Sequence, residues 1–361
     1  MVAPNHHLYS PEQAARSTVA AVRYQSTLAR RLAKPLTGAQ PAGKGASVAF
    51  ASPIYIDPAR VYNRDMRRRE ERIEYSDLYQ DVTSIELTDQ VYNAVKLPDD
   101  FYTFTLQNLE QQVIRPMAQS VADQINNTIV GTLDGVQAGL TKADTAARGS
   151  IVDENDKVYT DRAAFRDAGT KFKAFGAGIK GINNKSLQAS NQREALRAVR
   201  AAAQVFGQRG ITNAGRILVV GAAWEAAFLD NDQLRKVNEA GTSDALRQAT
   251  LGYLYGFEVI VDYTIDPTAA YALDAEGVAL VTQTTAIPRG IAFGSTISQD
   301  GFTLRYLQDY DPDILTDRAV VDTFAGAKIL DSQRVLKLTG TENMADLSGN
   351  ESQPSTDTPS S

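Results

Sequence analysis

One segment of the sequence is too long and too regular for an ordinary compact domain. Between residues 99 and 133, apolar side chains recur every three or four positions, which is the spacing of one face of an α-helix. They are Leu106, Leu109, Val113, Met117, Val121, Ile125, Ile129 and Leu133. About 35 residues of helix would extend roughly 50 Å. Pro116 removes one backbone hydrogen bond, so we expect a bend there. Such a helix suits a flat, elongated subunit.

A second segment combines a buried strand, a helix and another strand. Residues 216–220 form an apolar run, and residues 222–229 have the composition of a buried helix around the single Trp224. A polar loop follows. Gly252 and Gly256, four residues apart, then lead into a second apolar run that ends at Val261. We expect Trp224 to pack in a core and not to stack on a ligand.

The composition excludes several classes of protein. The chain has 361 residues, of which 43% are hydrophobic and 22% are charged, values typical of a folded domain. It has no cysteine, which excludes disulfides, thiolate metal sites and cysteine nucleophiles, and suits a reducing cytoplasm. No apolar run approaches the roughly 20 residues that span a bilayer, and the first residues lack a signal-peptide layout. A net charge of −6 argues against a general nucleic-acid binder, though not against a local basic arm.

The first 45 residues have the pattern of a mobile basic arm. A weak helix is expected from Pro11, capped by Ser10, to about Leu32. The linker composition of residues 35–45 then ends it. Six basic residues face one acid, Glu12, which gives a local charge of +5. The basic residues are Arg16, Arg23, Arg30, Arg31, Lys34 and Lys44.

Residues 46–97 have the pattern of an extended hairpin. Strand-like runs at 47–56 and 82–97 flank a highly charged span that cannot form a core alone. The charged residues of this span that we expect at an interface are Arg60, Arg64, Arg67, Arg68, Arg69, Glu70, Glu71 and Arg72. Most charge runs are simply solvated. Here the hairpin offers little apolar surface of its own and needs something to lie on, which favours an interface.

The remaining elements are less sharply patterned. Residues 141–190 are polar and rich in Gly and Asn, with one short helix near residues 162–175, and an Ala-rich helix follows at 193–207. Further strands are expected at 278–282, 290–293 and 303–308, with a short apolar run at 319–328. From residue 338 onward the chain has no aromatic or basic residue, and we expect a disordered tail.

No pattern in the sequence supports a catalytic, cofactor or metal site. Residues 176–181 match the dinucleotide fingerprint GxGxxG, but the required strand before it and helix after it are missing, so a flexible glycine loop is expected. His6 and His7 are the only histidines, and both lie in the arm. The acidic runs 153–156 and 230–232 lack the glycine and the terminal glutamate of a calcium loop, so solvated loops are expected.

The order of these elements resembles the major capsid proteins of tailed bacteriophages, over roughly residues 45–335. The charged hairpin resembles the family's E-loop, the long helix resembles the spine helix of its P-domain, and residues 216–261 resemble its A-domain core. Residues 301–306 and 322–330 resemble the closing P-domain strands. The resemblance implies an α+β chain with the Hong Kong 97-type capsid fold. No lysine lies between Lys44 and Lys96, so the isopeptide cross-link that some members form from the E-loop is not expected.

The resemblance also implies a division of the chain. The expected parts are an arm at 1–45, a strand and E-loop hairpin at 46–97, a P-domain with the spine helix at 98–190, an A-domain at 191–295, returning P-domain strands at 296–337 and a tail at 338–361. The basic residues Arg16, Arg23, Arg30, Arg31 and Lys34 are then expected on the inner face of a shell.

The implied function is structural and not enzymatic. Copies of the chain would form hexamers and pentamers of an icosahedral head that encloses double-stranded DNA. The implied partners are a separate scaffolding protein, a portal, a decoration protein and, without sequence specificity, the packaged DNA, with no membrane. The implied location is the virion, and the host cytoplasm during assembly. An encapsulin-like nanocompartment shell stays open as the alternative. A hydrolase or a nucleotide-dependent enzyme would need a rigid site that the sequence lacks.

Overall fold

The computed structural model describes most of the chain between residues 16 and 345. The described residues are 16, 18–20, 27–34, 47–51, 54–56, 59, 61–73, 75–76, 78–79, 82–98, 110–231, 252–291, 293–299, 301–313 and 316–345. The predictions that concern His6, His7, Arg23, Arg60 and the loop at 232–245 therefore lie outside the described residues, as does the start of the long helix at 99–109.

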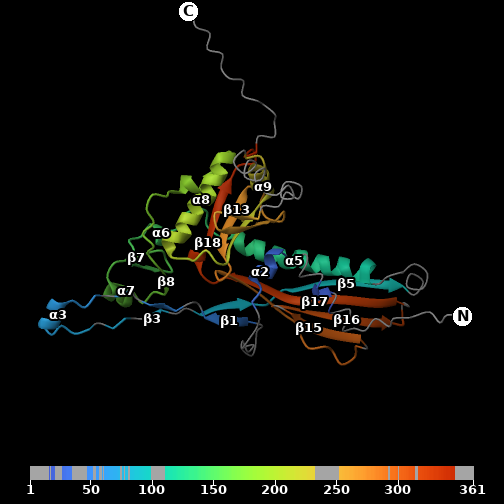
Figure 1. The fold of residues 1–361 in the computed structure, drawn as a ribbon. Helices are drawn as coiled ribbons and strands as arrows, with labels where there is room; N and C mark the ends of the chain where they lie inside the picture. Colours follow the sequence, from blue (N-terminus) through green and yellow to red (C-terminus); the bar gives the residue numbers. More distant parts are fainter. Residues whose placement is uncertain are drawn as a thin grey trace, which may run out of the picture.

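The molecule is elongated, with a thin hairpin at one end and a long sheet at the other (Figure 1). The long sheet has five antiparallel strands. Along the sheet they are β14 (Val278–Gln283), β17 (Thr316–Ile329), β16 (Phe302–Asp311) and β15 (Phe293–Gln299), and β5 (Gln90–Pro98) pairs with the first half of β17. β17 has fourteen residues and joins the two parts of the sheet because it pairs with β5 at one end and β14 at the other.

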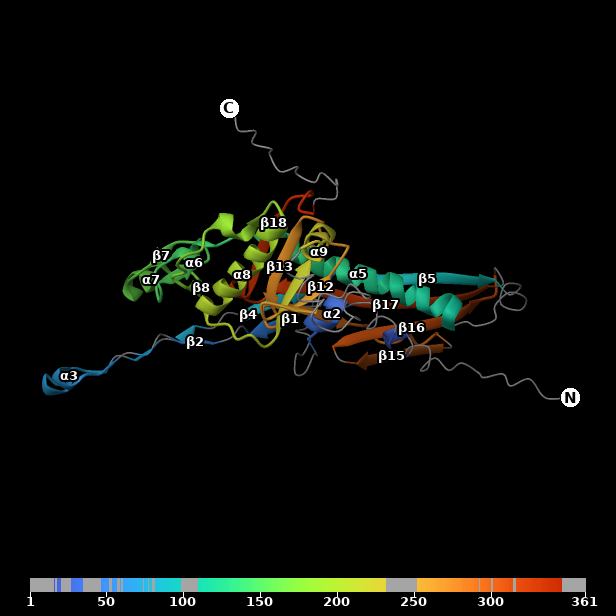
Figure 2. The same cartoon turned by 45° about the horizontal axis from the view of Figure 1, so that its top comes forward.

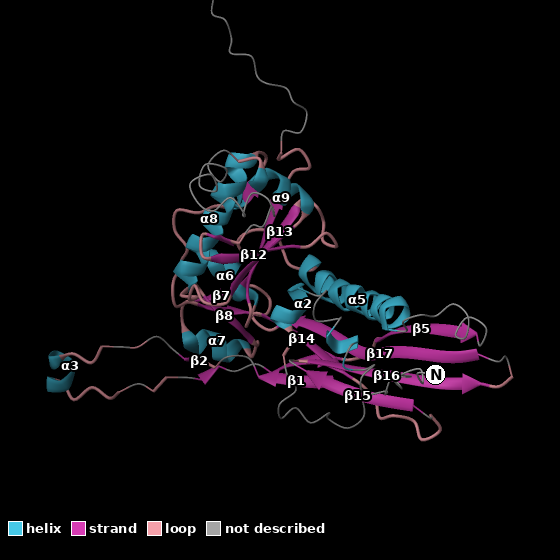
Figure 3. Ribbon diagram, turned by 45° about the vertical axis from the view of Figure 1, so that its right-hand side comes forward, coloured by secondary structure: helices cyan, strands magenta, loops and turns pink. Residues whose placement is uncertain are grey.

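The long helix α5 (Arg115–Asp134) lies along this sheet (Figure 3). Its apolar stripe is buried, and Val113, Val121 and Ile125 share one hydrophobic cluster with side chains of β16 and β17. The sequence predicts all three in the apolar stripe of the long helix, facing strands of the segment 302–330, and this is confirmed. Leu109 lies outside the described residues. A π-turn, Glu110–Ile114, precedes α5, and Pro116 is the second residue of the helix. A π-turn next to a proline is an irregularity of the kind expected there.

A six-stranded sheet forms the upper part of the molecule. Along the sheet the strands are β11 (Tyr253–Leu254), β12 (Phe257–Val261), β10 (Arg216–Val220), β13 (Ala269–Asp274), β18 (Val335–Gly340) and β9 (Gln188–Ala189). The helices α8 (Gln192–Arg209) and α9 (Ala222–Leu229) bury their apolar faces in one cluster with these strands. The predicted strand–helix–strand segment and the buried Trp224 are confirmed.

A small side module follows α5 in the chain. It has a three-stranded sheet of β7 (Val158–Tyr159), β6 (Ile151–Asp153) and β8 (Phe172–Phe175), with the helices α6 (Lys142–Thr145) and α7 (Arg162–Ala168). Figure 2 shows this module beside α8, on the side from which the hairpin projects. The helix predicted near residues 162–175 is shorter in the structure, where α7 ends at Ala168. Gly169, with φ of 62°, ends α7 in the left-handed conformation, and the chain then continues as β8.

One strand was missed, and two further predictions, on a strand and on the tail, are corrected. β13 was not expected, although all six of its residues are buried. The strand expected at 290–293 instead begins at Phe293. Residues 338–345 are not a disordered tail, because β18 continues to Gly340 after a short 3₁₀ turn, Ser332–Arg334, and Met344 is buried against the core. The polar composition of this segment conceals the few apolar residues that pack.

The N-terminal region is also more ordered than its composition indicates. The helix α2 (Thr27–Leu32) contacts α5 and β14, and Leu28 and Leu32 are fully buried. The backbone N–H of Lys34 donates a hydrogen bond of 3.0 Å to the carbonyl oxygen of Leu280. The expectation of a mobile arm is therefore wrong for residues 27–34, since two buried leucines and a backbone bridge fix them to the body.

Two strands belong to a different sheet from the one that the expected division implies. β14 falls within the part expected to be the A-domain, yet it pairs with β17 in the five-stranded sheet. β18 starts within the part expected to return to the P-domain, yet it pairs with β13 in the six-stranded sheet. The chain thus crosses between the two sheets after β13 and again after β17.

Candidate functional site

The hairpin packs on the body at its root, and its outer part projects away from the body (Figure 1). β1 (Ser47–Ala51) pairs with β4 (Val82–Glu86) at its root, and β2 (Tyr55–Ile56) pairs with β3 (Leu78–Tyr79) farther out. The run at 82–97, expected as one strand, is two strands, because β4 pairs with β1 and β5 pairs with β17. Beyond β2 and β3 the two arms extend to a short helix, α3 (Arg64–Arg68), at the tip (Figure 1).

The tip brings the predicted charged residues together. Asn63 caps α3 by accepting a hydrogen bond of 2.9 Å from the backbone N–H of Met66. Glu70 then reverses the chain with φ of 53°. No residue of α3 is buried. The predicted residues that the structure places at this tip are Arg64, Arg67, Arg68, Arg69, Glu70, Glu71 and Arg72. An ion pair of 3.3 Å joins Arg69 to Glu71 within the tip, and the five arginines of the tip are exposed.

The hairpin also exposes many large apolar side chains, which the sequence analysis missed. Their exposed fractions are 55% for Ile54, 58% for Ile56, 84% for Val61, 68% for Ile73, 90% for Tyr75 and 69% for Leu78. The expectation that the hairpin has little apolar surface is therefore wrong. Apolar residues are interspersed among the charged ones on both sides of the run 67–72, and they were the available signal. Several large apolar side chains exposed on one thin hairpin indicate an interaction site in a soluble protein.

The basic residues of the arm are not part of this tip. Arg16 and Arg30 are exposed, and Lys34 is half-buried. Arg31 forms an ion pair with Glu258 of β12, so its charge is already used within the chain. The structure therefore does not gather the predicted arm residues into one basic patch with the hairpin.

The glycine-rich segment 176–181 has a structural explanation. The backbone N–H groups of Ala177 and Gly178 donate to the carbonyls of Ala143 and Ala146, each at 3.0 Å, so the loop is held and the expectation of a flexible loop is wrong. A Cβ atom on Gly176 would lie 2.2 Å from the carbonyl oxygen of Ala147, so this position admits only glycine. The next described helical element after the motif is a 3₁₀ turn, Asn184–Leu187, and not the α-helix that the dinucleotide fingerprint requires.

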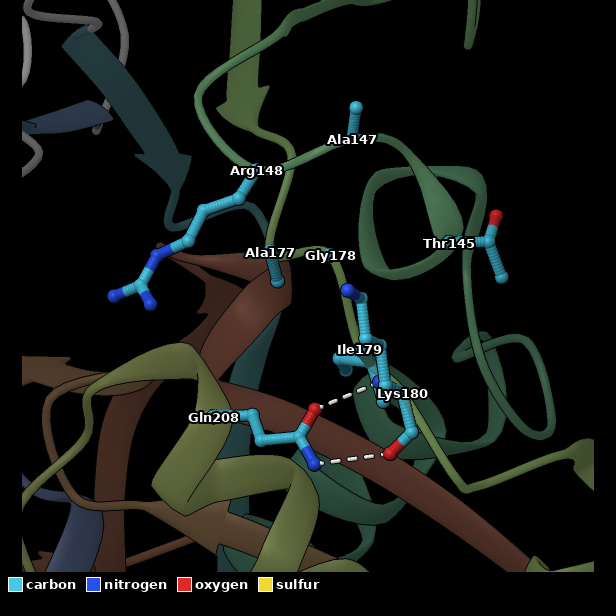
Figure 4. Close-up of a pocket in the computed structure, with 8 residues that line it drawn as sticks. All are labelled: Thr145, Ala147, Arg148, Ala177, Gly178, Ile179, Lys180 and Gln208. Carbon is cyan, nitrogen blue, oxygen red and sulfur yellow. Dashed lines mark hydrogen bonds between the residues drawn. The ribbon is translucent and has the colours of Figure 1, made fainter.

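This glycine-rich segment lines an open pocket of about 630 Å³, shown in Figure 4. Gln208 fixes Lys180 there by accepting a bond of 2.8 Å from its backbone N–H and donating one of 3.1 Å to its carbonyl. Arg148 and Lys180 supply positive charge, but the polar side chain of Gln208 is already satisfied. Nothing in this arrangement selects a ligand.

The acidic run at 153–156 is used by the side module itself. Asp153 accepts hydrogen bonds from the backbone N–H groups of Asn155 and Lys157 and from the Tyr159 hydroxyl, at 3.0, 2.9 and 3.1 Å. Desolvation alone would raise the pKa of Asp153. These hydrogen bonds lower the pKa by more than burial raises it, so the net direction is downward. Asp156 forms an ion pair of 2.7 Å with Lys173.

Within the described parts of the chain, no three His, Cys, Asp or Glu side chains lie close enough together to hold a metal ion. Among the same residues, no helix is both long and apolar enough to cross a membrane. The hairpin, with its exposed apolar and charged side chains, is the feature that best fits a functional role.

No protein-family model and no curated protein matches the chain. Solved structures do match it. The capsid structure of the cyanophage P-SCSP1u aligns with a TM-score of 0.52 at 9% identity, over 84% of this chain and 85% of that chain. The mature capsid of bacteriophage PhiM1 aligns with a TM-score of 0.52 at 9% identity, over 83% of each chain. A virus-like particle from Pyrococcus furiosus gives a TM-score of 0.45 at 11% identity, over 91% of this chain and 98% of that chain.

The two phage capsid structures identify the fold. The chain has the mixed α+β Hong Kong 97-type fold of tailed-phage capsid proteins, as its sequence resemblance predicts, at an identity too low for the alignment itself to indicate a function.

Proposed function

We propose that this chain is the major capsid protein of a tailed bacteriophage, a non-catalytic subunit that assembles into an icosahedral shell around double-stranded DNA. The observation that carries the proposal is the projecting hairpin, on a chain with a capsid-protein fold. Its large apolar side chains are exposed in the single chain, and a second copy lying against them would bury them. The tip arginines would add charge contacts to the same interface.

The parts of the fold correspond to roles in such a shell. We assign the five-stranded sheet with α5 to the P-domain, the six-stranded sheet with α8 and α9 to the A-domain, and the hairpin to the E-loop. In this assignment β14 moves to the P-domain and β18 to the A-domain, as their pairing requires. Hexamers and pentamers of the chain would then recruit a scaffolding protein, a portal and a decoration protein.

Replacing Arg67, Arg68 and Arg69 together by glutamate is expected to block assembly while the subunit stays folded. All three are exposed, so the free energy of unfolding should change by less than about 0.5 kcal/mol for each. Like charges brought together across an interface cost several kcal/mol, and each 1.4 kcal/mol is a factor of ten. We expect the yield of closed particles in electron micrographs to fall at least about tenfold.

The matched control is the replacement of the same three arginines by lysine, which keeps the positive charge. It should assemble normally. A normal particle yield from the glutamate variant would show that the tip does not lie at an interface. Particles that enclose protein cargo in place of DNA would favour the nanocompartment alternative.

The basic arm is proposed to lie on the inner face of the shell, where it would contact neighbouring subunits, scaffold or DNA phosphates. Phosphate contacts of this kind are salt-dependent and not specific for sequence. The proposal concerns Arg16, Arg23, Arg30 and Lys34, since Arg31 is paired with Glu258 within the chain.

Limited trypsin digestion tests this placement. The bonds after Arg30 and Arg31 should resist cleavage even in free subunits, because α2 is packed on the body through Leu28 and Leu32. The bond after Arg16, next to the buried Thr18 and Val19, should be cleaved slowly in free subunits and should be fully protected only in closed, DNA-filled particles. Peptide mass spectrometry reads the sites. Rapid cleavage after Arg16 in intact particles would place the arm outside the shell.

A further inference from the structure

Among the described residues of the hairpin, Tyr79 packs its aromatic side chain against the side module. Tyr79, in β3, stacks on Phe172 with ring centroids 4.8 Å apart and planes 21° apart. Its ring meets Phe175 edge-on at 5.7 Å and Phe165 edge-on at 6.3 Å. Phe165 in turn packs on Tyr159 at 5.5 Å. Tyr79 thus fills an aromatic socket formed by α7, β7 and β8, from a strand about ninety residues earlier in the chain.

The outer ribbon of the hairpin has two different faces. Successive residues of a strand point to opposite faces, and β2 pairs with β3 through Ile56 with Leu78 and Tyr55 with Tyr79. The face with Ile56 and Leu78 is exposed, at 58% and 69%. The face with Tyr79 packs on the side module of the same chain. One face of the ribbon is therefore available for a neighbour, while the other anchors the ribbon.

The socket is itself fixed to the body. Within the side module, Asp144 of α6 forms a bidentate ion pair with Arg209 of α8, with both bonds at 2.8 Å and both side chains buried. The carbonyl oxygen of Phe175, a socket residue, accepts a bond of 2.7 Å from the side-chain amide of Gln333. Gln333 lies in the 3₁₀ turn between β17 and β18, where the chain crosses between the two sheets. A continuous path of contacts thus joins both sheets to Tyr79.

We propose that Tyr79 is a positioning residue that sets the angle at which the hairpin leaves the body, with Phe165, Phe172 and Phe175 as its socket. The root of the hairpin is packed on β14 through Val48 and Ile85. Tyr79 lies farther out, where it can orient the ribbon beyond this root, and α3 has no buried residue that could orient it from the tip. The consequence for assembly rests on the proposed function. Subunits whose hairpins point in one direction reach the neighbour without loss of conformational freedom, which favours closed particles.

Spin-label distance measurements on the unassembled subunit test the socket directly. The chain has no cysteine, so Arg64→Cys at the tip and Gln204→Cys on the exposed side of α8 give one unique label pair. The parent pair should give a narrow distance distribution. Tyr79→Ala should broaden it at least about twofold, because the ring contacts are lost. Tyr79→Phe keeps the ring and should stay narrow, as should Tyr75→Ala, which removes a ring that is 90% exposed on the same hairpin.

An unchanged distribution in Tyr79→Ala overturns the proposal. If that variant fails to fold, Phe172→Leu applies the same test from the socket side. This measurement uses single subunits, so its result does not depend on the proposed shell function. The Tyr79 proposal can be overturned while the chain still forms shells, and it can be supported even if the chain never forms them. In assembly, Tyr79→Ala should give at least about fivefold fewer closed particles than Tyr79→Phe. A broadened distribution with a normal particle yield would overturn the link between the hairpin angle and assembly.

Discussion

Replacing Arg209 by methionine is expected to lower the free energy of unfolding by about 3–5 kcal/mol at neutral pH. The Arg209 and Asp144 side chains are 1% and 0% exposed and are joined by two hydrogen bonds of 2.8 Å. Methionine leaves the carboxylate buried without its cation, and the cost of an unpaired buried charge exceeds the net worth of the pair. The same guanidinium also donates to the Gln333 carbonyl, which would lose a partner. Urea denaturation measures the change.

The pH dependence of this difference has a definite sign. Burial raises the pKa of Asp144, but the hydrogen bonds and charge of Arg209, with bonds from Thr141, lower it more, so the net direction is downward. In the parent protein this carboxylate therefore stabilises the fold above its unfolded pKa, and the contribution is lost as the pH falls through the folded pKa. Without Arg209, burial dominates and the pKa of Asp144 is raised. In Arg209→Met the unpaired carboxylate destabilises the fold above this raised pKa, and the destabilisation shrinks on acidification. The difference in free energy of unfolding between the parent and Arg209→Met should therefore narrow between pH 7 and about pH 4.5.

Two further variants test whether the loss comes from the unpaired buried charge. Arg197→Met removes an exposed arginine from the same helix, where it pairs with Glu194 at 3.2 Å, and should cost less than about 0.5 kcal/mol. The double variant Arg209→Met with Asp144→Asn removes the buried charge but keeps an acceptor for Thr141, and should recover much of the loss. A loss below about 1 kcal/mol in Arg209→Met would mean that Asp144 reaches water, and that the side module is not fixed to α8 in solution.

Periodic segments of the chain could be predicted from the sequence, and contacts between distant segments could not. The stripe through Val121 and Ile125 predicted α5 because a helix buries one face whatever covers it. The socket of Tyr79 joins residues about ninety positions apart, and no local pattern signals such a contact. The same holds for Asp144 and Arg209, which are 65 positions apart. Neither the Tyr79 socket nor the Asp144–Arg209 ion pair could therefore be predicted from the sequence.

The candidate site was predicted in part. The arginines of the hairpin tip stand out as a charge run, and the structure gathers the described ones at one place. The apolar residues between them, such as Val61 and Ile73, were overlooked because charge dominates the average of that window. Composition misled in the same way at the C-terminal end. A window of polar residues indicates disorder, yet Leu338 and Met344 pack in the core and residues 338–340 pair with neighbouring strands of the sheet.

Replacing Trp224 by alanine is expected to lower the free energy of unfolding by about 3–5 kcal/mol. The indole is fully buried, and its ring centroid lies 6.0 Å from that of Phe228. Its N–H donates a bond of 2.7 Å to the carbonyl of Thr268. A Cβ atom on Gly340 would lie 2.4 Å from Met344 and 3.0 Å from the indole nitrogen, so the segment after β18 closes directly over this ring. Alanine leaves a large cavity that this packing cannot collapse to fill.

Trp224→Phe separates the two contributions of the indole. It keeps most of the apolar volume but leaves the Thr268 carbonyl without its donor, and should cost less than alanine, about 1–3 kcal/mol. Tyr253→Ala removes an aromatic ring that is 79% exposed on the six-stranded sheet, against which α9 packs, and should change the free energy of unfolding by less than about 0.5 kcal/mol. Thermal or urea unfolding followed by circular dichroism compares the three variants.

Because Trp224 is the only tryptophan, its fluorescence reports on the segment that covers it. The intact chain should emit at short wavelength, as a fully buried indole does. A chain that ends at Gly340 lacks Met344 and should emit at longer wavelength, because water then reaches the ring. Met344→Leu nearly preserves the volume and should leave the emission unchanged. Identical spectra from the intact and shortened chains would mean that residues 341–345 do not pack on the core, and the sequence-based expectation of a disordered tail would then hold from residue 341.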